Sequence, residues 1–454
     1  MKQFADDTIT AIATPIGIGG VGIVRISGDG AKPLLEKIYK PSCEQEIKSH
    51  QMLHGLLVDP DNGKHIDEAM ACYMQSPKSF TGEDVAEIYC HGGQAVLQQV
   101  LALVLAQGAR LAQRGEFTKR AFLNKKLDLS QSEAVLALIQ APTAKGAGFA
   151  LQQLEGRLSK TVNNLRLRLV NLQAELEGAL DFSDDLPPLD YSRFQLGINA
   201  IISEVSQLLA SASSGKIYRE GLSTAIIGKP NVGKSSLLNA FLKEERAIVT
   251  DVPGTTRDAI EELININGLP LRIIDTAGLR QTKDRLEGSG IERTEKELAA
   301  ADFVLIVLDR SQEIDALDKM VLDKARGKPG VVVLNKSDLP KRLNDKGLGK
   351  IFFDVSALTG AGVHELSLGI FNEVQKNLGQ ESSSSVIINS RHKECLSRAQ
   401  GSLVKSAETV SKKLSPEFIA VDLKESIVAL GEVTGEIVSD EIINTIFDQF
   451  CIGK

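Results

Sequence analysis

Tryptophan is absent from the 454-residue chain, and aromatic residues make up only 4% of it. The hydrophobic cores must therefore be aliphatic, and nucleic-acid bases would find few aromatic rings to stack on. Positive charge is also scarce, because 52 Lys and Arg residues face 59 Asp and Glu residues, for a formal net charge of −7. That balance argues against a general polyanion-binding protein, which needs concentrated positive charge.

Cysteines are few, and long apolar runs are missing. The five cysteines are widely spaced and include no Cys-x-x-Cys pair, so neither a disulfide framework nor a structural zinc site is expected. The first residues lack the long apolar segment of a signal peptide, and apolar runs such as 303–308 are too short to cross a membrane. We therefore expect a soluble cytoplasmic protein with no membrane partner.

The remaining composition is that of an ordinary globular protein, with 43% hydrophobic and 24% charged residues. At about 150 residues per domain, the length suggests roughly three domains. Short β-type runs bounded by Gly, Pro and Ser predict strands. They lie at 9–13, 21–26, 69–74, 224–227, 271–274, 303–308, 331–334 and 351–355.

The composition of the sequence and the spacing of its apolar residues change three times along the chain, which predicts four segments. Residues 1–118 combine strands with a helix at 96–107, as in an α+β domain. Leu, Ala, Gln and Glu recur at helical spacing in 119–215 and again in 377–454, which predicts two parts of one helical domain. In 216–376 strands alternate with helices, which indicates βαβ units and a mainly parallel sheet. We therefore expect an α/β domain inserted into a helical domain, preceded by a separate N-terminal domain.

One glycine-rich stretch carries the strongest chemical signal. Residues 228–235 read Gly-Lys-Pro-Asn-Val-Gly-Lys-Ser, between an apolar strand and a helical run. In that context the pattern predicts a P-loop, because its glycines let backbone N–H groups curl around phosphates at a helix N-terminus. Lys234 would reach the β and γ phosphates, and Ser235 would bind Mg²⁺.

Three more motifs follow the ends of later apolar strands. Asp-Thr-Ala-Gly at 275–278 would support Mg²⁺ and sense the γ-phosphate. Asn-Lys-Ser-Asp at 335–338 ends in a carboxylate that can accept two N–H groups of guanine, which adenine lacks. Ser-Ala-Leu at 356–358 offers backbone donors to guanine O6. Their order and spacing match the motif series of Ras-like GTPases, so the expected nucleotide is GTP.

Residues 250–256, Thr-Asp-Val-Pro-Gly-Thr-Thr, are a candidate switch loop, in which Thr256 would close onto Mg²⁺ and the γ-phosphate. The complete set of expected GTP contacts is Asn231, Val232, Gly233, Lys234, Ser235, Ser236, Thr250, Asp251, Val252, Pro253, Gly254, Thr255, Thr256, Asp275, Thr276, Ala277, Gly278, Asn335, Lys336, Asp338, Ser356, Ala357 and Leu358.

One expected catalytic group is missing. Leu279 stands where Ras-type GTPases have, there or two residues on, a glutamine that orients the attacking water. Gln281 is a loose substitute, and the polar stretch that follows offers other candidates, each of which reads more readily as a solvated charge than as a catalyst. These candidates are Asp284, Glu287 and Glu292.

Motifs outside the α/β segment extend the pattern to the rest of the chain. They are Pro-x-Gly-x-Gly-Gly-x-Gly-x-Val-Arg-x-Ser-Gly at 15–28, Phe-Thr-Gly-Glu-Asp at 80–84, His-Gly-Gly at 91–93, Arg-Gly-Glu-Phe-Thr-x-Arg-Ala-Phe-Leu-Asn at 114–124 and Phe-Cys-Ile-Gly-Lys at 450–454. On these motifs, essentially the whole chain resembles the MnmE family of bacterial tRNA modification GTPases. The glycines at 17, 19 and 22 also fit a dinucleotide fingerprint, but a strand follows them where that fingerprint needs a helix.

The resemblance implies a GTP hydrolase (EC 3.6 class) with an inserted Ras-like P-loop G domain. It implies a homodimer held through N-terminal domains that bind a tetrahydrofolate derivative, 5-formyl- or methylene-tetrahydrofolate. It further implies a heterotetramer or larger complex with the FAD protein MnmG. That complex would add a carboxymethylaminomethyl or aminomethyl group to C5 of the wobble uridine of certain tRNAs.

Residue by residue, the resemblance assigns the remaining candidates. Folate-binding positions of the family are matched by Arg25, Glu87, Lys126 and Lys454, and the ligands of an activating K⁺ by Asn231, Thr250, Val252 and Thr255. The Mg²⁺ ligands are matched by Ser235 and Thr256. Glu287 matches the water-orienting glutamate, and Cys451 matches the C-terminal cysteine. Lys126 is preferred to Lys125 by counting back from Leu-Asp-Leu at 127–129.

The chemistry of the residues supports some of these assignments more strongly than others. A K⁺ ion prefers oxygen ligands, and its charge beside the phosphates would replace an arginine finger and answer the gap at Leu279. Without the resemblance, Arg25, Glu87 and Lys126 would each read as surface ion-pair residues. Two alternatives stay open at this point, a ribosome-assembly GTPase and a folate enzyme that works independently of GTP.

Overall fold

The computed structural model describes residues 7–43, 45–181, 189–244, 262–274, 290–345, 348, 350–378 and 386–454. It divides into two compact units, one made of 1–136 with 430–454 and the other of 137–429. The chain passes between them inside α4 (Leu129–Gln140) and α15 (Pro416–Thr434). The expected boundaries at 118, 215 and 376 divide the chain more finely and stay a prediction. Among the described helices, none is long and apolar enough to cross a membrane.

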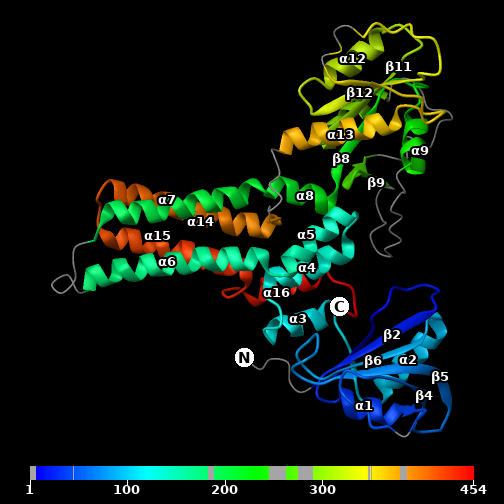
Figure 1. Ribbon diagram of the computed structural model, residues 1–454, viewed down its shortest axis with the longest axis vertical. Coiled ribbons are helices and arrows are strands. Elements are labelled where there is room, and N and C mark those ends of the chain that lie inside the picture. Colours follow the sequence, from blue (N-terminus) through cyan, green and yellow to red (C-terminus); the bar gives the residue numbers. More distant parts are fainter. Residues whose placement is uncertain are drawn as a thin grey trace. The chain divides into compact units, whose positions relative to one another are not determined.

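A seven-stranded sheet forms the centre of the first unit, in the order β3-β4-β5-β6-β2-β1-β7 (Figure 1). Its strands are β1 (Ile9–Ile12), β2 (Val21–Ser27), β3 (Tyr39–Pro41), β4 (Met52–Val58), β5 (His65–Met74), β6 (Val85–His91) and β7 (Arg110–Leu111). The strands expected at 9–13, 21–26 and 69–74 are confirmed as β1, β2 and part of β5. Strand neighbours pair antiparallel except β1 with β7.

Alternating residues give this sheet two different faces. Val24, Ile26, Ala86 and Ile88 are buried in a core shared with α1 (Ala31–Ile38) and α2 (Gln94–Ala106). Helix α2 confirms the helix expected at 96–107. Arg25 of β2 and Glu87 and Tyr89 of β6 lie on the opposite face and are only partly buried. Polar side chains therefore gather on the face that α1 and α2 leave uncovered.

Two short helices of the first unit come from parts of the sequence that are far apart. They are α3 (Glu116–Leu123) and α16 (Asp440–Phe447). Lys119 Nζ donates to Asn444 Oδ1 at 2.8 Å, and the rings of Phe122 and Phe447 are 6.3 Å apart between centroids. These contacts bring the motif at 450–454 into the first unit.

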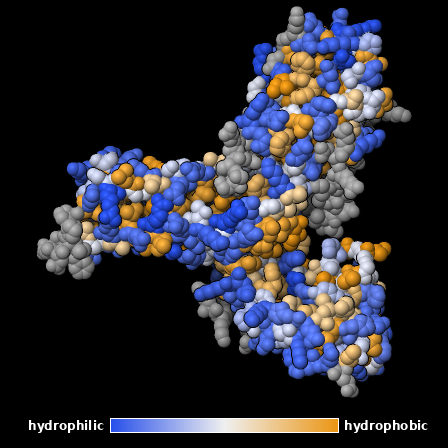
Figure 2. Space-filling view, in the orientation of Figure 1, coloured by the Kyte–Doolittle hydropathy of each residue, from blue (hydrophilic) through white to orange (hydrophobic). Residues whose placement is uncertain are grey.

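Helices make up much of the second unit. They are α5 (Ala144–Leu154), α6 (Arg157–Asp181), α7 (Tyr191–Ala210), α8 (Ala212–Glu220), α14 (Ser390–Ser411) and α15. Leu165, Leu169 and Leu176 of α6 are fully buried, whereas Leu167 is 59% exposed, as expected for a helix with one buried face. Figure 2 shows hydrophilic and hydrophobic residues intermixed on the visible surface of these helices.

A six-stranded sheet, in the order β13-β12-β11-β8-β10-β9, forms the rest of the second unit. The strands are β8 (Leu222–Ile227), β9 (Glu262–Ile266), β10 (Leu269–Ile273), β11 (Phe303–Asp309), β12 (Gly330–Asn335) and β13 (Phe352–Asp354). All five strands expected here are confirmed, and they pair parallel. Sequence reasoning missed β9, which pairs antiparallel with β10. Asn267-Gly268, both with positive φ, turns this hairpin and was the signal that could have revealed it.

Helices cover both faces of this sheet. Helices α9 (Lys234–Glu244) and α13 (Val363–Leu378) supply Leu237, Phe241 and Leu366 to one core. Helices α11 (Gly290–Ala300) and α12 (Ala316–Lys324) supply Leu298 and Val321 to the other. This is a doubly covered, mainly parallel α/β sheet, in which ligands bind beyond the carboxyl ends of the strands.

Candidate nucleotide and ligand sites

The P-loop has the strand–loop–helix geometry that its sequence predicts. Strand β8 ends at Ile227, α9 begins at Lys234, and the segment between them turns through positive φ values at Gly228 (154°), Asn231 (66°) and Gly233 (96°). A residue other than glycine rarely adopts such a φ, and Asn is among the few that tolerate it. The loop therefore presents a curled backbone at a helix N-terminus, which suits an anion.

Lys234 folds back over its own loop. Its Nζ atom donates to the carbonyl oxygens of Gly228 and Lys229, at 2.7 and 2.9 Å. These acceptors are neutral, so a phosphate oxygen would make a stronger, charge-assisted hydrogen bond with the same ammonium group. The lysine thus lies beside the loop with contacts that a nucleotide can replace.

Asn335 joins the expected phosphate and guanine loops. Its side chain is buried at the end of β12, where Nδ2 donates to Val232 O at 2.8 Å and Oδ1 accepts from Ala357 N at 3.0 Å. A Cβ atom built on Gly233 would touch Asn335 Nδ2, so only glycine fits at that point of the P-loop. The structure therefore brings three of the expected GTP-binding motifs together through one side chain.

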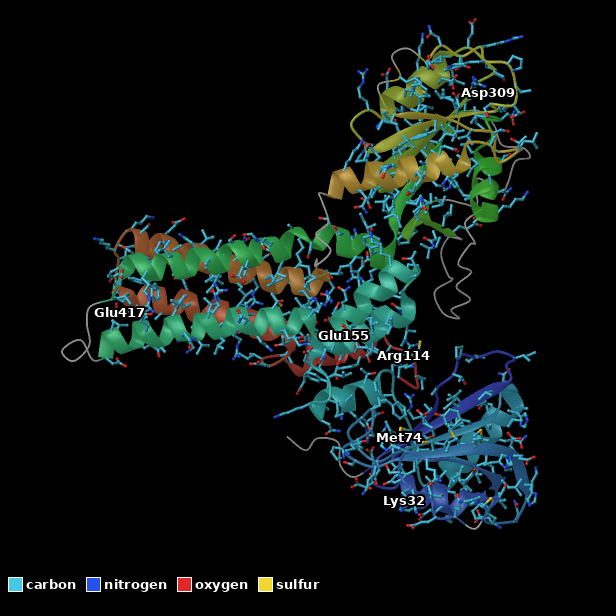
Figure 3. The ribbon with its side chains drawn as sticks, viewed as in Figure 1. Lys32, Met74, Arg114, Glu155, Asp309 and Glu417 are labelled. Atoms are coloured by element: carbon cyan, nitrogen blue, oxygen red, sulfur yellow. The ribbon has the colours of Figure 1, made fainter. Side chains whose placement is uncertain are left out.

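Two side chains of the expected guanine motif, Asp338 and Lys336, are held by hydrogen bonds to other residues. Ser356 Oγ donates to Asp338 Oδ1 at 2.6 Å, and Asp338 itself is exposed. Lys336 Nζ donates to Asp309 Oδ2 at 2.6 Å; Asp309 is labelled in Figure 3. Burial alone would raise the pKa of Asp309, but the bonds from Lys336 and Ser311 outweigh it and lower that pKa. Leu358, the last residue of this motif set, is 84% exposed.

Several expected residues lie outside the described ranges. These are the whole of 250–256 with Thr256, the motif at 275–278, and Leu279, Gln281, Asp284 and Glu287. Glu292 falls in α11. The expected Mg²⁺ ligand Ser235 is the second residue of α9, and the expected K⁺ ligand Asn231 lies in the P-loop turn.

A second group of expected residues meets on the uncovered face of the first sheet. Arg25 on β2 and Glu87 on β6 are register partners, and Arg25 Nε donates to Glu87 Oε1 at 2.7 Å. Their side chains are 15% and 13% exposed. The guanidinium also lies 5.7 Å from the ring centroid of Phe80 and 5.6 Å from that of Phe117. We call Arg25, Glu87 and Lys454 the sheet-face site.

Glu87 has a further partner that sequence reasoning missed. Tyr89 Oη donates to Glu87 Oε2 at 2.5 Å. Burial raises the pKa of Tyr89 and its bond to Glu87 raises it further, so the phenol stays a donor. Burial and the Glu87 charge also raise the pKa of Cys72, the register partner of Glu87 on β5. The two-residue period of a strand could have pointed to Tyr89, because residues 87 and 89 share a face.

The C-terminal motif contributes its last two residues to this site. Arg25 Nη1 donates to Gly453 O at 3.3 Å, and Ile452 forms an isolated antiparallel bridge with Arg114. Gly453 has φ 99°, and a Cβ atom there would strike Ile12 O, so glycine is required. Burial lowers the pKa of Lys454, and the nearby charge of Arg25 lowers it further. Cys451 is exposed.

Lys126 lies on an adjoining loop. It is exposed, and its Nζ donates to Pro77 O at 2.9 Å, on the segment that also carries Phe80. Lys125 is exposed too and has φ 58°. The structure thus brings Arg25, Glu87 and Lys454 into one group and places Lys126 beside the loop next to it.

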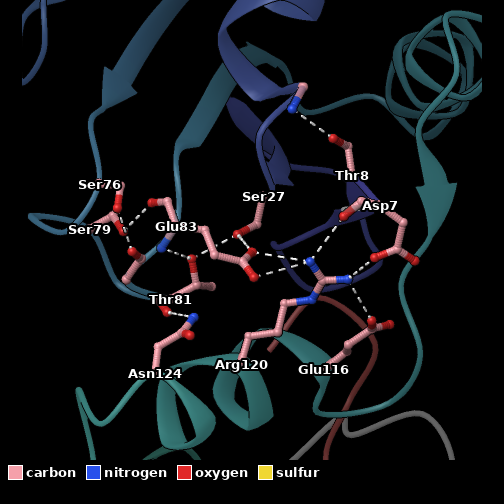
Figure 4. Close-up of polar contacts among 12 residues, drawn as sticks. Asp7, Thr8, Ser27, Ser76, Ser79, Thr81, Glu83, Glu116, Arg120 and Asn124 are labelled. Carbon is pink, nitrogen blue, oxygen red and sulfur yellow. Dashed lines mark hydrogen bonds and ion pairs between the residues drawn. The ribbon is translucent and has the colours of Figure 1, made fainter. Parts of the chain in front are cut away.

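Motif residues at 80–84 and 114–124 form a buried ionic network (Figure 4). Arg120 Nη2 donates to Glu116 Oε1 at 3.0 Å and to Asp7 Oδ1 at 2.7 Å, and its Nη1 lies 3.1 Å from Glu83 Oε2. Ser27 Oγ donates to the same Glu83 oxygen at 2.8 Å. Arg120 and Glu116 are 3% and 1% exposed in their side chains. These residues therefore support the sheet and α3. From the sequence, they were singled out only through the family resemblance.

Strand β8, the curled P-loop and α9, together with the Asn335 and Asp338 motif, define a P-loop GTPase domain. Models of two protein families also match the chain, GTP-binding protein TrmE N-terminus over residues 8–126 and MnmE helical domain over residues 129–451. The second match spans more than half of the chain.

Curated relatives described as tRNA modification GTPase MnmE match along their whole length. The protein from Alkaliphilus oremlandii is 45% identical over 100% of both chains. Those from Desulforamulus reducens and Enterococcus faecalis are each 43% identical, over 99% of this chain and 100% and 98% of theirs. The chain belongs to the MnmE family of tRNA modification GTPases. This confirms the family and the GTP hydrolase activity expected from the sequence.

Proposed function

We propose that this chain is a K⁺-activated GTPase that works in the cytoplasm with the FAD protein MnmG. Together they add a carboxymethylaminomethyl or aminomethyl group to C5 of the wobble uridine of certain tRNAs. A 5-formyl- or methylene-tetrahydrofolate bound at the N-terminal domain would supply the one-carbon unit, and that domain would also hold the homodimer together. The observation that carries the proposal is the meeting of Arg25, Glu87 and Lys454 in one site.

The chemistry of the sheet-face site suits a folate. The Glu87 carboxylate is fixed by Arg25 and Tyr89, and each oxygen keeps a lone pair for the paired N–H groups of a pterin. Arg25 and Lys454 are two cations beside one carboxylate, so an anionic group is favoured there, and it would offset the burial and the repulsion from Arg25 that lower the pKa of Lys454. The glutamate tail of the ligand would supply that group, its formyl oxygen could accept hydrogen bonds from the same cations, and Lys126 lies on the adjoining loop.

Titration of the purified protein with 5-formyltetrahydrofolate tests this site. Glu87→Gln keeps the shape but removes the charge, and we expect it to weaken binding by about tenfold or more. Glu68→Gln is the matched control, since Glu68 is a carboxylate of the same sheet, 63% exposed and paired with His54 at 3.2 Å. Absence of binding to the unaltered protein, or equal effects of the two variants, would contradict the folate assignment.

A K⁺ site is supported by Asn231. Its side-chain carbonyl is a hard oxygen ligand on a turn of the phosphate loop, and the other expected ligands are Thr250, Val252 and Thr255. A cation there would stabilise the negative charge that develops on the phosphates, as an arginine finger does. Glu287 would orient the water, and Ser235 and Thr256 would bind Mg²⁺.

GTP hydrolysis measured in KCl and in NaCl tests the K⁺ site. We expect the rate to be at least about tenfold higher in KCl. Asn231→Gly should abolish that difference while keeping the loop, because glycine adopts the φ of 66° without strain. Asn231→Ala should also weaken nucleotide binding. Equal rates of the unaltered protein in both salts would exclude the proposed ligand set.

The tRNA product is tested in cells. Nucleosides from a strain that lacks the gene should have lost the modified wobble uridine, and the intact gene should restore it. Cys451→Ser examines whether that exposed thiol takes part in the modification. Unchanged wobble uridines in the deletion strain would exclude the proposed product.

A further inference from the structure

Lys229, the second residue of the P-loop, joins that loop to a helix much further along the chain. Its Nζ atom lies 2.9 Å from Asp315 Oδ2 and 2.9 Å from Asp318 Oδ2. The lysine side chain is 11% exposed and that of Asp318 only 4%. An ammonium group shared between two carboxylates, one of them buried, links two parts of the chain more strongly than an ordinary surface ion pair does.

The two acids already hold the N-terminus of α12. Asp315 Oδ1 accepts from Asp318 N at 2.9 Å, and Asp318 Oδ2 accepts from Asp315 N at 3.3 Å, which is a reciprocal capping box. The bond from the Asp318 amide and the bond from Lys229 lower the pKa of Asp315 to about 2. Lys229 is therefore fastened to a rigid helix end.

The P-loop needs such a fastening at its first residues. The loop contains three positive φ values, one of them at Asn231, and such a backbone persists only where its surroundings hold it. Asn335 holds the end of the loop through Val232 O. Lys234 holds the start through Gly228 O and Lys229 O, but this lysine must turn to the phosphates when a nucleotide binds. The bond of Lys229 to α12 does not depend on Lys234.

We propose that Lys229 is a positioning residue of the GTPase site, which keeps the first half of the P-loop in its phosphate-binding shape through Asp315 and Asp318 of α12. It also balances two carboxylates that stand next to a loop built for anions. Lys229 acts on nucleotide binding through the loop and does not touch the reacting atoms.

Binding of GDP and GTP hydrolysis by the full-length protein test this role. Lys229→Met should weaken GDP binding by about tenfold, whereas kcat at saturating GTP should change by less than about twofold. Lys229→Arg should bind GDP within about threefold of the unaltered protein, because it keeps the charge. Asp318→Asn should weaken GDP binding in the same direction, and adding it to Lys229→Met should cause little further loss.

A second ion pair on the same helix is the matched control. Lys324 Nζ lies 2.6 Å from Glu295 Oε1 and ties the last turn of α12 to α11. Lys324→Met and Glu295→Gln should leave GDP binding unchanged, although both remove a link to α12. If Lys229→Met does not fold, Asp315→Asn and Asp318→Asn carry the test alone.

Two results would overturn the proposal. One is GDP binding unchanged in Lys229→Met and Asp318→Asn, whatever their melting temperatures; if those temperatures fall, the pair serves stability only. The other is an equal loss of GDP binding in the control variants at Lys324 and Glu295.

Discussion

The nucleotide site and the sheet-face site both set a cation beside a glycine that cannot be replaced, but they hold that cation differently. In the nucleotide site, Lys234 contacts two neutral carbonyl oxygens. In the sheet-face site, Arg25 is bonded to the charged Glu87 and lies near two aromatic rings. The first cation is ready to exchange weak acceptors for phosphate, while the second is fixed before any ligand arrives.

The difference shows two ways of preparing a site. A strongly charged ligand such as a nucleotide needs a positive charge that can turn to it, and two acceptors of Lys234 are neutral carbonyl oxygens that a phosphate can replace. A ligand with both donors and acceptors needs fixed directions, so its site is built from side chains that hold one another. The predictions below test this contrast from the largest expected effect to the smallest.

Removing the replaceable cation should have the largest effect. Lys234→Ala takes away the ammonium group expected on the β and γ phosphates, so GTP hydrolysis should fall by at least about 100-fold. Binding of 5-formyltetrahydrofolate should not change, because its proposed site lies in the other unit. Lys243→Ala, an exposed lysine in the last turn of α9, is the control and should hydrolyse GTP normally. Loss of both activities in Lys234→Ala would show that the sites are not independent.

The ionic network of Arg120, Glu116, Asp7 and Glu83 supports the sheet that carries the sheet-face site. Its stability should fall when a charge is removed and when the pH is lowered. Glu116→Gln leaves the 3%-exposed Arg120 without one carboxylate partner, and we expect a loss of about 3 kcal/mol in the free energy of unfolding of this unit. Glu36→Gln, in an exposed pair 3.6 Å from Lys32, should cost below about 0.5 kcal/mol. Hydrogen exchange of the β2 and β6 amides measures both.

The acid dependence of that network follows from Glu116. Burial alone would raise the pKa of Glu116, but hydrogen bonds from Arg110, the Gln113 amide and Arg120 outweigh it and lower that pKa below its usual value of 4.5. Its contribution to stability is therefore complete above that usual value and is lost as pH falls through the lower folded value. The difference between Glu116→Gln and the unaltered protein should shrink in acid. A difference that stays constant with pH would rule out this role of Glu116.

The smallest effect should come from the glycine of the sheet-face site. Gly453→Ala places a Cβ atom against Ile12 O at a φ of 99°, which should shift Lys454 and weaken folate binding by about threefold to tenfold. Gly63→Ala is the control for the unfavourable φ alone, because Gly63 has φ 71° and open space around it. GTP hydrolysis should stay unchanged in both variants. Equal folate binding by the two would show that the contact with Ile12 is unimportant.

The strand, turn and helix of the P-loop could be predicted from the sequence because each of these parts is local. The P-loop motif carries its strand, turn and helix within one short segment, and the guanine motif follows directly after an apolar strand. What it could not predict are the links between parts, such as Lys229 with Asp318 or Asn335 with Val232. These depend on which loops the sheet order brings together.

The sheet-face site shows the same limit more strongly. Arg25 and Glu87 were candidates only through a resemblance, because their pairing depends on the register of β2 with β6. Tyr89 could have been chosen from strand periodicity once Glu87 was placed on a face. The role of Glu116 and Arg120 needed the position of Asp7 and of the loop with Glu83, all far apart in the sequence. Resemblance marked these residues, and tertiary packing explains them.

The contact between Gly233 and Asn335 limits which substitutions the sequence can accept in evolution. Since a methyl group at 233 would strike the Asn335 amide, a side chain at 233 could fit only if the residue at 335 changed as well. Asp338, exposed and bonded to Ser356, is under no such constraint from the P-loop. Over generations, a change at 233 would need a second change at 335, whereas position 338 could change by itself.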